Sequence, residues 1–148
     1  MIRSSLFGVA LGMAGGMAWA GKPPAVAGDY IVELRETSNN CPNGGLQLVN
    51  KTLTIEQTSR SKQLKVLLPP TAIMRGSIDA KANVKARAKR GGTAIQGLMG
   101  EFDVAGSAGD AKVDFVLIGH YFTADKPPKP YCTQSWSVKG AKKTSARR

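Results

Sequence analysis

The feature that most constrains the fold of this chain is an alternation of apolar and polar residues with a period of two. The alternation is typical of β-strands with one buried and one solvated face, because successive strand side chains point to opposite faces. Hardly any stretch has the 3.6-residue period of an amphipathic helix. We therefore expect an all-β protein, with strands in eight alternating stretches: 30–35, 52–56, 63–68, 73–79, 84–89, 98–104, 113–121 and 135–139.

Short connections rich in Gly, Pro, Ser and Asn separate these stretches, including breaks at 90–92 and 105–111. No connection is long enough for a crossover helix, so successive strands should be antiparallel. This arrangement predicts an eight-stranded up-and-down barrel, and a two-sheet β-sandwich is the alternative. Glycines inside the stretches predict bends or bulges at Gly76, Gly97, Gly100 and Gly119.

The two cysteines of the chain test the barrel prediction. Cys41 follows the first alternating stretch, and Cys132 precedes the last one. If these two strands pair antiparallel, the end of the first lies beside the start of the last. A closed barrel therefore places both cysteines at one rim, where we expect them to form a disulfide. The alternative is a pair of free buried thiols.

The first twenty residues have the composition of a secretory signal peptide. A basic start at Arg3 precedes an apolar run, and Ala18-Trp19-Ala20 has the small-x-small pattern of a cleavage site. The run is too short to span a bilayer. We predict cleavage after Ala20, one β-barrel domain over residues 21–140 and a disordered basic tail over 141–148. The expected location is the periplasm or the medium of a bacterium.

Gly28-Asp29-Tyr30, at the start of the first stretch, resembles the Gly-x-Trp signature of the lipocalins. Tyr30 stands in place of the tryptophan, and the chain lacks a C-terminal helical pattern. The resemblance implies a one-ended barrel that holds a small apolar ligand. Large inward residues could line such a cavity, or they could fill the core together with small inward residues. The large ones are Tyr30, Phe102, Phe115, Tyr121 and Trp136.

A basic stretch over residues 81–90 gives the chain its most distinctive surface. Strand geometry places Lys85, Arg87 and Lys89 on one outward face. In the hairpin to the next strand, we expect Ala86 to lie opposite Leu98, which leaves no acidic residue opposite the row. Arg75 should lie on the neighbouring outward face, and Arg90 ends the stretch. These five cations could form an anion-binding surface, or they could be an ordinary solvated face.

The formal net charge of +11 favours an anionic partner. Export argues against nucleic acid, and RNA-module aromatic motifs are absent. His120 should face outward, and no motif supplies a nucleophile or paired carboxylates around it, so we expect neither catalysis nor a metal or other cofactor. The first hypothesis is a non-enzymatic protein that binds an anionic envelope component. A carrier of a small apolar ligand and an inhibitor of an acidic enzyme are the alternatives.

Overall fold

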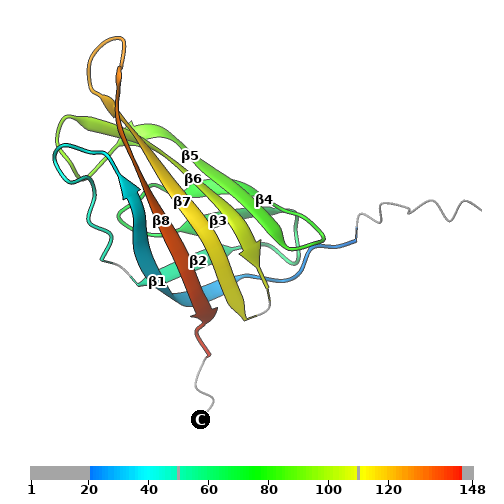
Figure 1. Cartoon of the computed structure of the whole chain (residues 1–148). Helices are drawn as coiled ribbons and strands as arrows, with labels where there is room; N and C mark the ends of the chain where they lie inside the picture. Colours follow the sequence, from blue (N-terminus) through cyan, green and yellow to red (C-terminus); the bar gives the residue numbers. More distant parts are fainter. Residues whose placement is uncertain (1–20, 50, 110, 145–148) are drawn as a thin grey trace, which may run out of the picture.

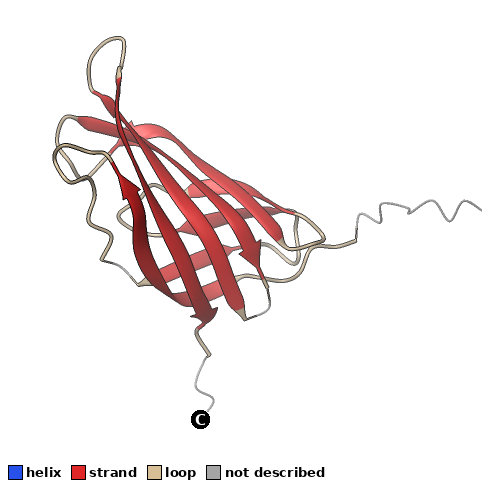
Figure 2. Cartoon of the chain, in the orientation of Figure 1, coloured by secondary structure: helices blue, strands red, loops and turns tan. Residues whose placement is uncertain are grey.

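The computed structural model describes residues 21–49, 51–109 and 111–144, which form a closed antiparallel barrel (Figure 1). The signal-peptide prediction falls on residues outside this range. Figure 2 shows strands and loops but no helix in the described part of the chain. Each strand pairs with its neighbours in sequence order, so the predicted up-and-down barrel is confirmed and the sandwich is not found. The strands are β1 (Gly28–Asn39), β2 (Thr52–Glu56), β3 (Gln63–Leu67), β4 (Met74–Ile78), β5 (Asn83–Gly92), β6 (Leu98–Ala108), β7 (Lys112–Thr123) and β8 (Pro130–Lys142).

The barrel closes where β1 pairs antiparallel with β8, from Tyr30 opposite Lys142 to Asn39 opposite Gln134. This pairing brings the end of β1 beside the start of β8. Cys41 and Cys132 form a disulfide there, with their Cα atoms 5.0 Å apart. The prediction that closure would join the two cysteines at one rim is therefore confirmed.

The core follows the alternation of the sequence, because every second strand residue points into the barrel. Tyr30, Phe115 and Tyr121 are among its largest fully buried side chains. Backbones approach each other closely at Gly76, where an added Cβ would collide with the carbonyl of Lys85. Gly76 is one of the four glycines predicted to bend or bulge, but its pairing with β3 and β5 shows no register shift. Gly97, by contrast, lies in the turn before β6 rather than inside a strand.

Several strands are longer than the sequence pattern predicted. β5 continues through the expected break at 90–92, and β6 continues to Ala108. Small residues that suggest breaks in isolation remain in the ladder, because β6 and β7 pair in one register from Leu98–Thr123 to Ala108–Val113. β8 ends at Lys142, so the domain extends two residues beyond the predicted boundary at 140. Residues 145–148 of the predicted tail lie outside the described range.

The barrel has two unequal walls. β5 to β8 and β1 contain 10 to 13 residues each, whereas β2, β3 and β4 contain five residues each. The cations predicted to form an anion-binding surface lie on the short strand β4 and on β5. In the part of the chain that the structure describes, no helix has the length and hydropathy needed to cross a membrane.

Candidate anion-binding site

The outer face of β4 and β5 carries the predicted cations. Arg75, Lys85, Arg87 and Lys89 are exposed, whereas the residues between those of β5, including Ala86, are buried. The predicted orientation is therefore right. β4 and β5 are neighbours, and Arg75 lies directly opposite Arg87.

The predicted pairing of β5 with β6 is wrong. Ala86 lies opposite Val104 rather than Leu98. The prediction placed the turn at residues 90–92, but β5 extends to Gly92 and the turn follows at residues 93–97. A shift in register between Ala88 and Gly91 adds a further irregularity. The longer hairpin brings acidic residues of β6 opposite the basic row, where none was expected.

Two of the five cations have acidic partners as a result. The Nε atom of Arg87 donates a 2.6 Å hydrogen bond to Oδ1 of Asp103. This hydrogen bond and the charge of the carboxylate raise the pKa of Arg87 above its usual value. Arg90 lies 3.1 Å from Glu101 and stacks over the ring of Phe122 at 3.7 Å. These two arginines are therefore each paired with a carboxylate.

The other three cations, Arg75, Lys85 and Lys89, differ in this respect. Among the described residues, no carboxylate oxygen lies within 4 Å of any of them. A hollow of about 340 Å³ opens between Arg75, Lys85 and Arg87. Its floor includes Ala105, which lies opposite Lys85 and leaves space above it. Arg75 and Lys85 line this hollow without a carboxylate partner, and Arg87 lines it together with its partner Asp103.

Sequence reasoning missed Lys65, which the fold adds to this surface. Lys65 in β3 lies directly opposite Arg75. The outward position of Lys65 was readable from the alternation, but its neighbour depended on the register of β3 and β4. Together they border a hollow of about 910 Å³ that is open to solvent. Its lining consists of Ala27, Ile55, Glu56, Gln57, Thr58, Ser61, Gln63, Leu64, Lys65, Arg75, Gly76 and Ser77.

A transverse row of outward side chains now crosses five strands. In order across β2 to β6, the row is Glu56, Lys65, Arg75, Arg87 and Asp103. Three adjacent cations occupy its centre and one acid stands at each end. Like charges directly opposite on neighbouring strands destabilise a sheet. A bound anion would reduce the repulsion between these adjacent cations. The outer face of β3, β4 and β5 is therefore suited to binding an anion.

The interior candidates lie where the sequence predicted, because all five large side chains are buried. Phe102 and Tyr121 make an edge-to-face contact with centroids 6.1 Å apart. A Cβ added at Gly119 would lie 3.1 Å from both the Phe102 ring and the Tyr121 hydroxyl. The aromatic rings therefore occupy the space beside this small residue. The ligand cavity stays a prediction.

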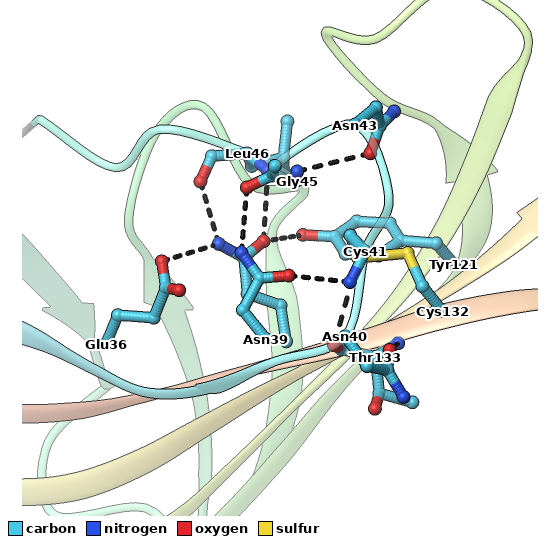
Figure 3. Close-up of a disulfide and its surroundings, with 12 residues drawn as sticks. Glu36, Asn39, Asn40, Cys41, Asn43, Gly45, Leu46, Tyr121, Cys132 and Thr133 are labelled. Carbon is cyan, nitrogen blue, oxygen red and sulfur yellow. Dashed lines mark hydrogen bonds between the residues drawn. A yellow bond between two sulfur atoms is a disulfide. The ribbon is translucent and has the colours of Figure 1, made fainter.

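The covering segment, residues 40–49 after β1, carries Cys41 of the disulfide and the buried Leu46 at this rim of the barrel (Figure 3). Gln134 is fully buried, and its side chain donates to the carbonyl of Leu46 and accepts from the Leu46 N–H, both at 3.0 Å. It also accepts a 2.9 Å hydrogen bond from Tyr121 and donates to Glu36. Burial, with a contribution from the Glu36 charge, raises the pKa of Tyr121 to about 12.

His120 is partly exposed, as expected, and its Nε2 atom lies 3.6 Å from Asp103. In the described part of the chain, no three His, Cys, Asp or Glu side chains come together as a metal ion would require.

The geometry defines a small disulfide-linked β-barrel with a basic outer face. Comparisons with protein-family models, curated proteins and solved structures found no match.

Proposed function

We propose that this chain is a non-enzymatic exported protein that binds an anionic envelope surface or polymer through the outer face of β3, β4 and β5. One observation carries the proposal. Arg75, Lys85 and Lys89 are exposed, and among the described residues no carboxylate lies within 4 Å of any of them. The disulfide supports export, because such bonds persist in oxidising compartments. The full sequence has a formal net charge of +11, and loss of the predicted signal peptide removes one cation, Arg3, so the exported chain would also attract anions.

The packing of the interior favours this outer face over a ligand site inside the barrel. Aromatic rings fill the space beside Gly100 and Gly119, and none of the five large inward residues lines the two hollows at Arg75. The cations are exposed to water, so each contact with an anion contributes little free energy and is screened by salt. Binding therefore depends on several contacts made at once.

The test compares two triple variants of equal charge. One reverses the basic face (Arg75→Glu, Lys85→Glu, Lys89→Glu), and the matched control reverses exposed lysines elsewhere (Lys112→Glu, Lys126→Glu, Lys129→Glu). Binding to lipopolysaccharide, anionic vesicles and anionic polysaccharide is measured by co-sedimentation or calorimetry. At about 50 mM salt the face variant should bind at least about tenfold more weakly than the control. The difference should vanish near 500 mM, where the Debye length is about 4 Å.

Circular dichroism establishes that both variants are folded. Equal loss of binding in the two variants would show that binding depends on net charge and not on this face, which would contradict the proposed site. Absence of binding by the wild-type protein at low salt would reject the proposal.

A further inference from the structure

We infer that the ligand is an acidic oligosaccharide seated in the hollow beside Lys65 and Arg75. This inference rests on the proposed function and names the chemical class of the anion. The hollow of about 910 Å³ is at the upper end of the size of ligand sites in proteins. Its walls come from the ends of β2, β3 and β4 and from the β2–β3 loop.

The two cations at this hollow are placed to hold acidic groups. Lys65 and Arg75 lie opposite each other on strands that run about 4.8 Å apart. Within the described residues, no carboxylate lies within 4 Å of either side chain. The guanidinium of an arginine can bind a carboxylate through two parallel hydrogen bonds, and a lysine adds a point charge beside it. A carboxylate or phosphate between them would neutralise both.

Besides Lys65 and Arg75, the charged residue of the lining is Glu56, and the other polar groups are neutral. Thr58, Gln63 and Ser77 border the hollow, and in the described part of the chain none of their own side chains makes a hydrogen bond, although the backbone N–H of Gln63 donates to Oγ of Ser61. Their hydroxyl and amide groups can both donate and accept. Glu56, at the end of the transverse row, can accept hydrogen bonds from ligand hydroxyls. A ligand that carries both acidic groups and many hydroxyls uses all of these side chains.

Two other polyanions fit this hollow less well. A flat lipid surface cannot enter a concave site, and none of the large exposed apolar residues, such as Ile73, lines it to insert into a bilayer. Proteins bind single-stranded nucleic acid with a basic groove and aromatic rings on which the bases stack, and no aromatic side chain is part of this lining. The hydrogen-bonding groups match sugar hydroxyls.

The experiment measures binding of four probes by calorimetry at about 50 mM salt. The probes are an oligogalacturonate, a neutral galacto-oligosaccharide of equal length, inorganic polyphosphate and phosphatidylglycerol vesicles. The variants are Lys65→Glu with Arg75→Glu, Gln63→Ala with Ser77→Ala, and the control Lys126→Glu with Lys129→Glu. Charge reversal at the hollow should weaken oligogalacturonate binding at least about tenfold. Loss of the neutral groups should weaken it about three- to tenfold, because each hydrogen bond contributes modestly.

The neutral-group variant distinguishes a sugar site from a charge site, because polyphosphate binding should not change in it. Equal effects on both polyanions, or no effect on either, would overturn the sugar assignment and leave the proposed function standing. Binding to vesicles alone would do the same. Failure of all three anionic probes to bind the wild-type protein would reject both proposals.

Discussion

Gln134 is the buried polar side chain that ties the covering segment to the barrel. Its amide satisfies both backbone groups of Leu46 and accepts from Tyr121. Gly45 makes this approach possible, because its φ of +71° suits glycine and an added Cβ would collide with the Gln134 amide. Position 134 lies just before the predicted stretch 135–139 and continues the inward alternation of Trp136 and Val138. The alternation does not predict that a loop residue 88 positions away completes the hydrogen bonds.

For the outward cations, as for Gln134, the alternation indicates which face a residue occupies but not which residue it contacts. The period of two predicted that Lys85, Arg87 and Lys89 share a face, and the structure confirms it. Which acid neutralises which cation depends on the neighbouring strand. Asp103 pairs with Arg87 because of the β5–β6 register, which no local pattern specifies.

Tyr121 should make the stability of the protein fall above pH 10. Burial raises its folded-state pKa to about 12, against an ordinary value of 10.0. Between these values the unfolded chain loses the phenolic proton and the folded protein keeps it, so rising pH favours unfolding. Tyr121→Phe removes this contribution. Urea unfolding at pH 8, 10 and 11 should therefore show a smaller loss of stability in Tyr121→Phe than in the wild type.

The control for this titration is Tyr131→Phe, since Tyr131 is 40 % exposed. It should follow the wild-type dependence on pH. Parallel curves for wild type and Tyr121→Phe would show that the buried hydroxyl does not govern alkaline stability.

In the β5–β6 hairpin, the sequence predicted the two strands but not the position of the turn between them. The sequence predicted both strands and their inward faces, because alternation is local. The turn was placed at Arg90-Gly91-Gly92, where two glycines follow a charge run. The chain turns instead at residues 93–97, where Thr93 bonds to the backbone of Ile95 and Leu98 and Gly97 has a φ of +83°. Residues 90–92 and 93–97 both contain glycine and could each form the turn. The pairing of β5 with β6 determines that the turn lies at 93–97.

The disulfide between Cys41 and Cys132 should stabilise the barrel. Cys41 anchors the covering segment to β8, and the bridge spans 91 positions of sequence. In the chain-entropy account, a loop of that length corresponds to about 4–5 kcal/mol, and removal of a native bridge commonly costs about 2–5 kcal/mol. Cys41→Ser with Cys132→Ser should therefore lower the denaturant midpoint markedly.

Reduction of the wild-type protein provides the matched comparison for this variant, because it breaks the same bond without a substitution. Both should unfold at the same lower midpoint. An unchanged midpoint, or native thiols that react with a maleimide, would contradict a stabilising bridge.

At the scale of the whole molecule, the sequence predicted the number of strands, their order and the closure of the barrel. Eight alternating stretches with short connections allow few other arrangements, and the cysteine positions agreed with closure. The two hollows around Arg75 were not predictable in the same way. Each is made by side chains from three or more neighbouring segments, and which side chains face one another depends on the strand register, as with Lys65 opposite Arg75.

The unequal walls of the barrel predict an uneven stability. β2, β3 and β4 have five residues each and so form few ladder hydrogen bonds, whereas β6, β7 and β8 contain 11 to 13 residues each. Local opening is easiest where few backbone hydrogen bonds must break together. Native-state hydrogen exchange should therefore show the amides of β2 to β4 exchanging well before those of β7. The faster wall would be the one that carries the proposed site, so an occupied hollow should slow exchange there first. Uniform exchange across all eight strands would mean that the barrel opens as one unit and that its short wall has no separate mobility.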